Sequence, residues 1–214
     1  MFLFLNAVGE NRLSIGLTGG YINTSANFSE GTGQKSTAFP GISAGITVQE
    51  MRTKYAAFQG SILFSEKAFG MNDSGSVYKR YINYIEMPLL TNFHIGKRSV
   101  RVNICVGPQF GLAVKNFERV NNADTTFFTK SPLAMSINNT EKFQFGLAGG
   151  MGISYHTKNY IIQLEGRYYQ GFSNVLAPRN FSYINQTTFG VFLSLFYTIP
   201  LKSETEKTDH EHSH

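Results

Sequence analysis

Side chains along most of this chain alternate between large apolar residues and small or polar ones. In segment 143–156 one row is Phe, Phe, Leu, Gly, Met, Ile and Tyr, and the other is Gln, Gly, Ala, Gly, Gly, Ser and His. Successive side chains of a β-strand point to opposite faces, so this pattern predicts a strand with two unlike faces. The same alternation predicts eight strands in all: 12–22, 39–49, 55–65, 81–94, 100–113, 143–156, 160–172 and 187–199.

The connections between these predicted strands alternate in length. Long polar segments follow every odd-numbered strand and cover residues 23–38, 66–79, 114–141 and 173–186, whereas the other connections are short turns. In an up-and-down meander, alternate connections lie at opposite ends. All long loops would therefore lie at one end, as in bacterial outer-membrane barrels, with the short turns and both termini at the other. The prediction for residues 12–200 is an all-β, eight-stranded antiparallel up-and-down transmembrane β-barrel with long loops at one end.

The composition of the two rows indicates which face is outside. A soluble barrel would turn its polar row to water, yet only 15% of this chain is charged, compared with about 25% in an average soluble domain. The interior of an eight-stranded barrel has room only for packed side chains. The row of Gly, Ser, Thr, Ala, Gln and Asn therefore fits the lumen, and the row of Phe, Ile, Leu and Tyr fits lipid. A soluble ligand-binding barrel is the alternative.

Other classes of protein are disfavoured by composition. No apolar run reaches the roughly 18 residues that suggest a membrane-spanning helix. The chain has one cysteine, Cys105, which excludes an internal disulfide framework and a Cys-rich zinc site. The net charge of +5 comes from scattered Lys and Arg residues, so the sequence predicts no nucleic-acid partner. We also expect no cofactor.

The two ends of the chain differ from the predicted barrel. Residues 1–11 contain an apolar stretch followed by the small triplet Ala7-Val8-Gly9, which is typical of the end of a secretory signal peptide. We interpret 1–11 as a truncated signal-peptide remnant, with an ordinary first strand as the alternative. Residues 201–214 are polar and His-rich, and we expect a disordered tail. Its His210, His212 and His214 are a candidate metal site, through imidazole ligands.

Four charged residues fall on the predicted inward row: Glu86, Arg101, Glu165 and Arg167. A buried charge needs a partner, because an unpaired ion inside a protein costs several kcal/mol. Two acids and two bases balance, so we predict a structural ion-pair cluster that fills the lumen. The alternatives are a gated polar pathway and catalysis by the two carboxylates. Catalysis is the weakest of these, since a filled lumen admits no substrate, and we expect no enzymatic activity.

Several strings of residues resemble one known family. Residues 84–90 (YIEMPLL) resemble a strand of the PorT-like outer-membrane β-barrel domain of Bacteroidetes. Residues 107–111 (GPQFG), 145–152 (FGLAGGMG) and 164–174 (LEGRYYQGFSN) resemble later strands of that family, in the same order. The resemblance covers roughly residues 12–200 and implies an eight-stranded outer-membrane barrel. The chain departs from the pattern at its end, where 17 residues follow Tyr197.

These observations predict a non-catalytic outer-membrane protein that is in contact with membrane lipid. Its expected role is structural, adhesive or partner-docking, exerted through the external loops and above all through residues 114–141. The alternative is an accessory component of protein secretion or transport across the outer membrane.

Overall fold

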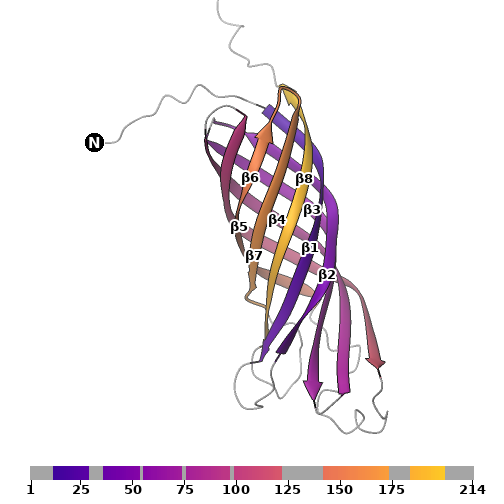
Figure 1. Cartoon of the computed structure of the whole chain (residues 1–214). Helices are drawn as coiled ribbons and strands as arrows, with labels where there is room; N and C mark the ends of the chain where they lie inside the picture. Colours follow the sequence, from indigo (N-terminus) through magenta and orange to yellow (C-terminus); the bar gives the residue numbers. More distant parts are fainter. Residues whose placement is uncertain are drawn as a thin grey trace, which may run out of the picture.

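Eight antiparallel strands pair in chain order, and β8 returns to pair with β1, so that the sheet closes into a barrel (Figure 1). The computed structural model describes residues 12–28, 36–53, 55–73, 76–96, 99–121, 142–173 and 184–200. The strands are β1 (Arg12–Phe28), β2 (Ser36–Met51), β3 (Ala56–Asp73), β4 (Ser76–Ile95), β5 (Val100–Asn121), β6 (Phe143–His156), β7 (Tyr160–Gly171) and β8 (Ile184–Pro200). The predicted fold class is confirmed.

The strands are strongly staggered around the barrel. The stagger can be followed from one paired residue to the next around the barrel. A path that starts at Met51 on β2 and passes through β3 to β8 and β1 returns to β2 at Gly41, ten residues nearer the loop end. With eight strands about 4.8 Å apart, this stagger corresponds to strands tilted by roughly 40° from the barrel axis. Such a tilt is typical of transmembrane barrels.

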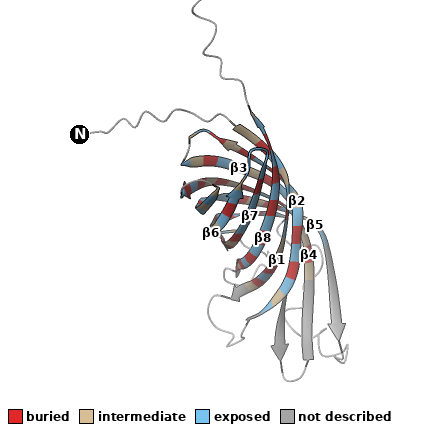
Figure 2. Cartoon of the chain, turned by 45° about the horizontal axis from the view of Figure 1, so that its top comes forward, coloured by how far each residue is buried: buried red, intermediate tan, exposed pale blue. Residues whose placement is uncertain are grey.

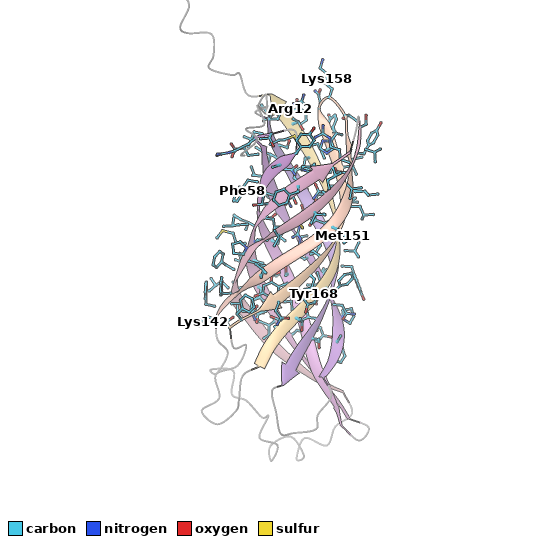
Figure 3. All side chains as sticks on the ribbon, turned by 90° about the vertical axis from the view of Figure 1, so that its left-hand side faces the viewer. Arg12, Phe58, Lys142, Met151, Lys158 and Tyr168 are labelled. Carbon is cyan, nitrogen blue, oxygen red and sulfur yellow. The ribbon has the colours of Figure 1, made fainter. Side chains whose placement is uncertain are left out.

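The two rows of side chains lie as predicted, with the large apolar row outside. Leu17, Ile62 and Met151 are 69%, 63% and 68% exposed, whereas Gln59, Ser65 and Asn103 are fully buried in the lumen. Figure 2 shows buried and exposed residues alternating along each strand, and in Figure 3 Phe58, Met151 and Tyr168 project outward. None of the described residues forms a helix long and apolar enough to cross a membrane.

Several strands are longer than the sequence pattern predicted. The expected loop at 66–79 is wrong: β3 continues to Asp73, β4 begins at Ser76, and these two residues pair. β1, β2 and β5 likewise extend into the predicted loops, with β5 reaching Asn121. The interstrand hydrogen bonds continue where the apolar alternation stops, since a hairpin outside the membrane needs no apolar face. Residues 29–35, 122–141 and 174–183 of the predicted loops lie outside the described residues.

The barrel therefore has two unlike ends. We call the end that carries the connections between β1 and β2, β3 and β4, β5 and β6, and β7 and β8 the loop end, and the opposite end the turn end. At the loop end, β3, β4 and β5 project beyond the other strands (Figure 1). β6 begins at Phe143, which pairs with Leu112, and Leu112 pairs with Ile85. Residues 76–84 of β4 lie beyond that row, and this projecting segment is roughly 30 Å long.

Candidate functional site

A buried ion pair joins β3 and β4 inside the lumen. Lys67 Nζ lies 2.6 Å from Glu86 Oε1, and the two side chains are 1% and 6% exposed. Gln109 on β5 donates a hydrogen bond of 2.8 Å from Nε2 to the same carboxylate oxygen. The ammonium group also lies over two aromatic rings, 5.4 Å from the centroid of Tyr84 and 4.9 Å from that of Tyr169. Each charge in this group thus has several partners, as burial requires.

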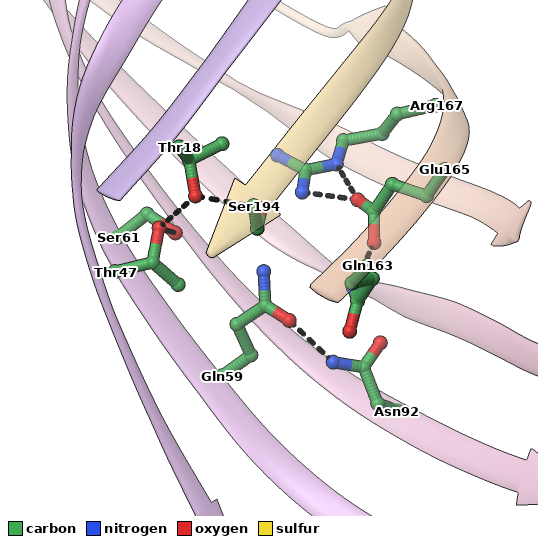
Figure 4. Close-up of polar contacts among 9 residues, drawn as sticks. All are labelled: Thr18, Thr47, Gln59, Ser61, Asn92, Gln163, Glu165, Arg167 and Ser194. Carbon is green, nitrogen blue, oxygen red and sulfur yellow. Dashed lines mark hydrogen bonds and ion pairs between the residues drawn. The ribbon is translucent and has the colours of Figure 1, made fainter. Parts of the chain in front are cut away.

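A second buried ion pair is built within β7. Glu165 and Arg167 are two residues apart, so both side chains point into the lumen. Arg167 donates to Glu165 Oε1 from Nε, at 2.7 Å, and from Nη2, while Gln163 donates to the other carboxylate oxygen (Figure 4). The guanidinium also lies 4.5 Å from the ring centroid of Phe192 on β8.

The four predicted charges do not form one cluster. Glu86 pairs with Gly111 in the β4–β5 ladder, and Arg101 lies ten residues from Gly111, toward the turn end of β5. The half-buried Arg101 extends instead toward Met51 on β2, with Nη1 3.9 Å from the sulfur. The buried ion pairs join Glu86 to Lys67 and Glu165 to Arg167, so Lys67 is a lumen charge that the prediction omitted.

Lys67 takes the place that the sequence analysis assigned to Arg101. It was missed because the predicted strand ended at residue 65, which left Lys67 in a presumed loop. The signal was nevertheless present. Ser61, Leu63, Ser65 and Lys67 continue one inward row at strict spacing of two, and all four are buried.

The two ion pairs leave little empty space between them. A cavity of about 20 Å³ separates them, lined by residues that include Lys67, Glu86, Arg167, Tyr169 and Phe192. A single water molecule needs roughly 10–15 Å³ on this measure, so the cavity is about the size of one water. We call the two ion pairs, with Gln109, Tyr84, Tyr169 and Phe192, the lumen plug.

On the side of the lumen formed by β8, β1, β2 and β3, hydroxyl side chains form hydrogen bonds with one another between strands. Thr18 on β1 contacts Thr47 on β2 at 2.7 Å and Ser194 on β8 at 2.8 Å. Thr47 donates in turn to Ser61 on β3 at 2.9 Å (Figure 4). Small hydroxyl side chains on four neighbouring strands thus pair with one another inside the lumen.

Toward the turn end, the lumen is lined by amides and a histidine with few protein partners. Asn92 donates to Gln59 Oε1 at 2.5 Å. Among the described residues, neither side-chain polar atom of Gln49, His94 or Asn103 has a hydrogen-bond partner, although all three residues are buried. The ring of His94 packs edge-on against His156, with centroids 5.7 Å apart. Buried polar atoms that lack protein partners generally bind water, so we expect this half of the lumen to be hydrated.

The metal candidates predicted from the sequence lie elsewhere. His210, His212 and His214 are outside the described residues, as are the predicted signal remnant at 1–11 and the tail at 201–214. Within the part of the chain that the structure describes, no group of three or more His, Cys, Asp or Glu side chains could hold a metal ion. Cys105 is buried and forms no disulfide bond in the described part of the chain.

Comparison with known proteins agrees with this architecture. Residues 6–177 match the family model described as the outer membrane protein beta-barrel domain. The chain belongs to this family. This outer-membrane barrel protein therefore resides in the outer membrane, where lipid surrounds its apolar face. No curated protein matches its sequence.

Two solved structures are similar to this chain at low sequence identity. OprG from Pseudomonas aeruginosa is 12% identical, with a TM-score of 0.56, and the match covers 90% of this chain and 98% of that one. Ail from Yersinia pestis is 13% identical, with a TM-score of 0.43, and the match covers 87% of this chain and 98% of that one. At such identities the likeness to OprG shows the fold alone.

Proposed function

We propose that this outer-membrane barrel is a non-catalytic, closed scaffold that presents its loop end to a partner. The lumen plug is the observation that carries this proposal. Buried ion pairs on β3–β4 and on β7, with a cavity of about one water between them, leave no room for a substrate or a solute at that level. Function would then lie at the surface of the barrel rather than in its lumen.

The projecting sheet supports a docking role at the loop end. A transmembrane β-strand needs only about 9–11 residues to cross the bilayer, whereas β3, β4 and β5 contain 18, 20 and 22 residues. The additional residues form a paired sheet with a fixed backbone, which costs less entropy on binding than a flexible loop of the same length. We propose that this sheet and residues 122–141 face the outside of the cell and bind the partner.

The resemblance to PorT-like barrels of Bacteroidetes refines this proposal. Four strings in matching order support it, from Tyr84–Leu90 to Leu164–Asn174. If the resemblance reflects a shared role, the partner belongs to a system that moves proteins across the outer membrane, and the barrel serves it as an accessory component. A structural or adhesive role uses the same surface with a different partner.

Planar-bilayer recording tests the closed lumen. We expect the purified wild-type protein to show no stable conductance, because the plug blocks the path of ions. A reproducible conductance that changes with Glu86→Gln would contradict the proposal and favour a transport pathway through the lumen.

Site-specific photo-crosslinking in cells tests the docking role. A photoreactive residue at position 128 belongs to the connection between β5 and β6, and the matched control at Tyr160 lies at the turn end. We expect a discrete protein adduct from position 128 and none from position 160. An adduct from position 160 alone would move the docking surface to the turn end.

A further inference from the structure

The apolar surface of the barrel is not uniformly convex. A groove of about 650 Å³ runs over β2, β3 and β4 on the face that contacts lipid. Its volume lies within the roughly 300–1,000 Å³ typical of small-molecule pockets. Ile46, Ile62 and Phe64 are among the residues of its walls, and all three are more than half exposed. The groove lining contains no charged side chain.

Two features of the sequence make the surface concave at the floor of the groove. Gly60 has no side chain, and a Cβ placed there would meet only Leu89 Cδ2, at 3.5 Å. The β3–β4 ladder is also interrupted beside it. Pairing runs up to Gly60 with Leu89 and resumes at Leu63 with Glu86. Pro88 lies in the gap and has no N–H to donate, so the ladder cannot be complete there.

The groove spans about two thirds of the hydrocarbon depth of one leaflet. From Leu89 to Ile85 the strand rises about 13 Å, which at a tilt of roughly 40° spans about 10 Å of a hydrocarbon core that is roughly 30 Å thick. The polar pair Glu66 and Asn83 lies only two residues beyond Ile85 toward the loop end. In the other direction β4 continues for six residues beyond Leu89, to the exposed Ile95. The groove therefore lies nearer the loop-end boundary of the apolar band.

We propose that this groove binds one acyl chain of a lipid in the loop-side leaflet. Removal from water contributes nothing here, because a lipid tail is already in hydrocarbon. Retention would come from van der Waals contact with a preformed concave wall, which adds contacts that a convex barrel surface lacks. The polar row at Glu66 and Asn83 marks the level at which the head group of that lipid would lie. This site is independent of the partner proposed at the loop end.

Native mass spectrometry of the detergent-solubilised protein with added palmitoyl-oleoyl phosphatidylethanolamine tests the proposal. We expect wild type to retain one lipid, and Gly60→Leu, which fills the floor, to lower that one-lipid adduct at least fivefold. Gly19→Leu is the matched control. Gly19 also faces lipid, and a Cβ there meets nothing within 4 Å. The control should keep the adduct.

Two outcomes would overturn the proposal. One is an undiminished adduct in a folded Gly60→Leu variant. The other is a wild-type dimer that Gly60→Leu dissociates without loss of lipid, which would assign the groove to a second copy. Heat-modifiable gel mobility reports folding of each variant. If Gly60→Leu does not fold, Ala44→Leu, which fills the groove from β2, replaces it with the same expected result.

Discussion

Lys67 reaches back along the lumen to Glu86, with Nζ 2.6 Å from Oε1. The register of the β3–β4 ladder pairs Glu86 with Leu63, four residues before Lys67. The long lysine stem therefore runs parallel to its own strand, across two inward positions, before it meets the carboxylate. This contact holds together adjacent strands at a level where the lumen contains no other lysine among the described residues.

Removing either partner of this ion pair should destabilise the barrel. Lys67→Met leaves the buried Glu86 carboxylate without its cation, and we expect a loss of about 3–5 kcal/mol in the free energy of unfolding. Glu86→Gln should cost a similar amount, because it leaves a buried ammonium group unpaired. Urea unfolding in lipid vesicles measures both.

The double variant Lys67→Met/Glu86→Gln is the decisive control. Once both charges are gone, neither is left unpaired, so the double variant should be more stable than either single variant. Additive losses would show that the two side chains do not depend on each other.

The two arginines of the predicted cluster should respond differently to substitution. Arg167 is buried and paired with Glu165, so Arg167→Ala should cost about 3–5 kcal/mol. Arg101 is half-buried at the turn end, and Arg101→Ala should cost about 1 kcal/mol or less. Equal losses in urea unfolding would contradict the separation of Arg101 from the lumen plug.

The sequence predicted the barrel because its two rows differ in chemistry over the whole membrane span. Side-chain alternation assigns residues such as Glu86 and Arg167 to the lumen without any knowledge of the neighbouring strands. The pattern ends where a strand leaves the lipid, since both faces can then be polar. Strand ends were therefore predicted too early, and Lys67 was lost with the end of β3.

Partners within the lumen could not be predicted in the same way. They depend on the stagger of the strands, which the ladder fixes at ten residues for one turn of the barrel. The sequence of a single strand does not tell how far that strand is shifted relative to its neighbours. Arg101 and Glu86 share the inward face, yet the β4–β5 register places them ten residues apart along β5. The Glu165–Arg167 pair needs no stagger, because both residues belong to one strand.

A glycine on the inward face should tolerate no side chain where two strands approach closely. A Cβ on Gly107 of β5 would overlap the carbonyl oxygen of Leu89 on β4, which is backbone and cannot rotate away. We expect Gly107→Ala to destabilise the barrel by about 1–3 kcal/mol, the usual cost of overpacking. Gly19→Ala, on the outward face with open space around it, should be close to neutral in the same unfolding assay.

The loop end should face the outside of the cell. Outer-membrane barrels place long connections outside and short turns in the periplasm. An epitope inserted near Asn122 should be labelled by antibody on intact cells, whereas an epitope after Lys202 should be labelled only after the outer membrane is permeabilised. Labelling of the second epitope and not the first on intact cells would reverse the orientation.

The two asparagines on the inward face near the turn end provide a test of hydration. Asn92 donates to Gln59, so Asn92→Leu removes a buried hydrogen bond and leaves an acceptor unpaired, at a cost of about 1–3 kcal/mol. Asn103 is equally buried, but neither of its amide atoms has a partner among the described residues. If water satisfies that amide, Asn103→Leu exchanges water contacts for apolar ones of similar volume, and its unfolding free energy should stay within about 1 kcal/mol of wild type. A large loss from Asn103→Leu would mean that this side chain bonds to the protein itself, and that the turn-end half of the lumen is as tightly packed as the plug.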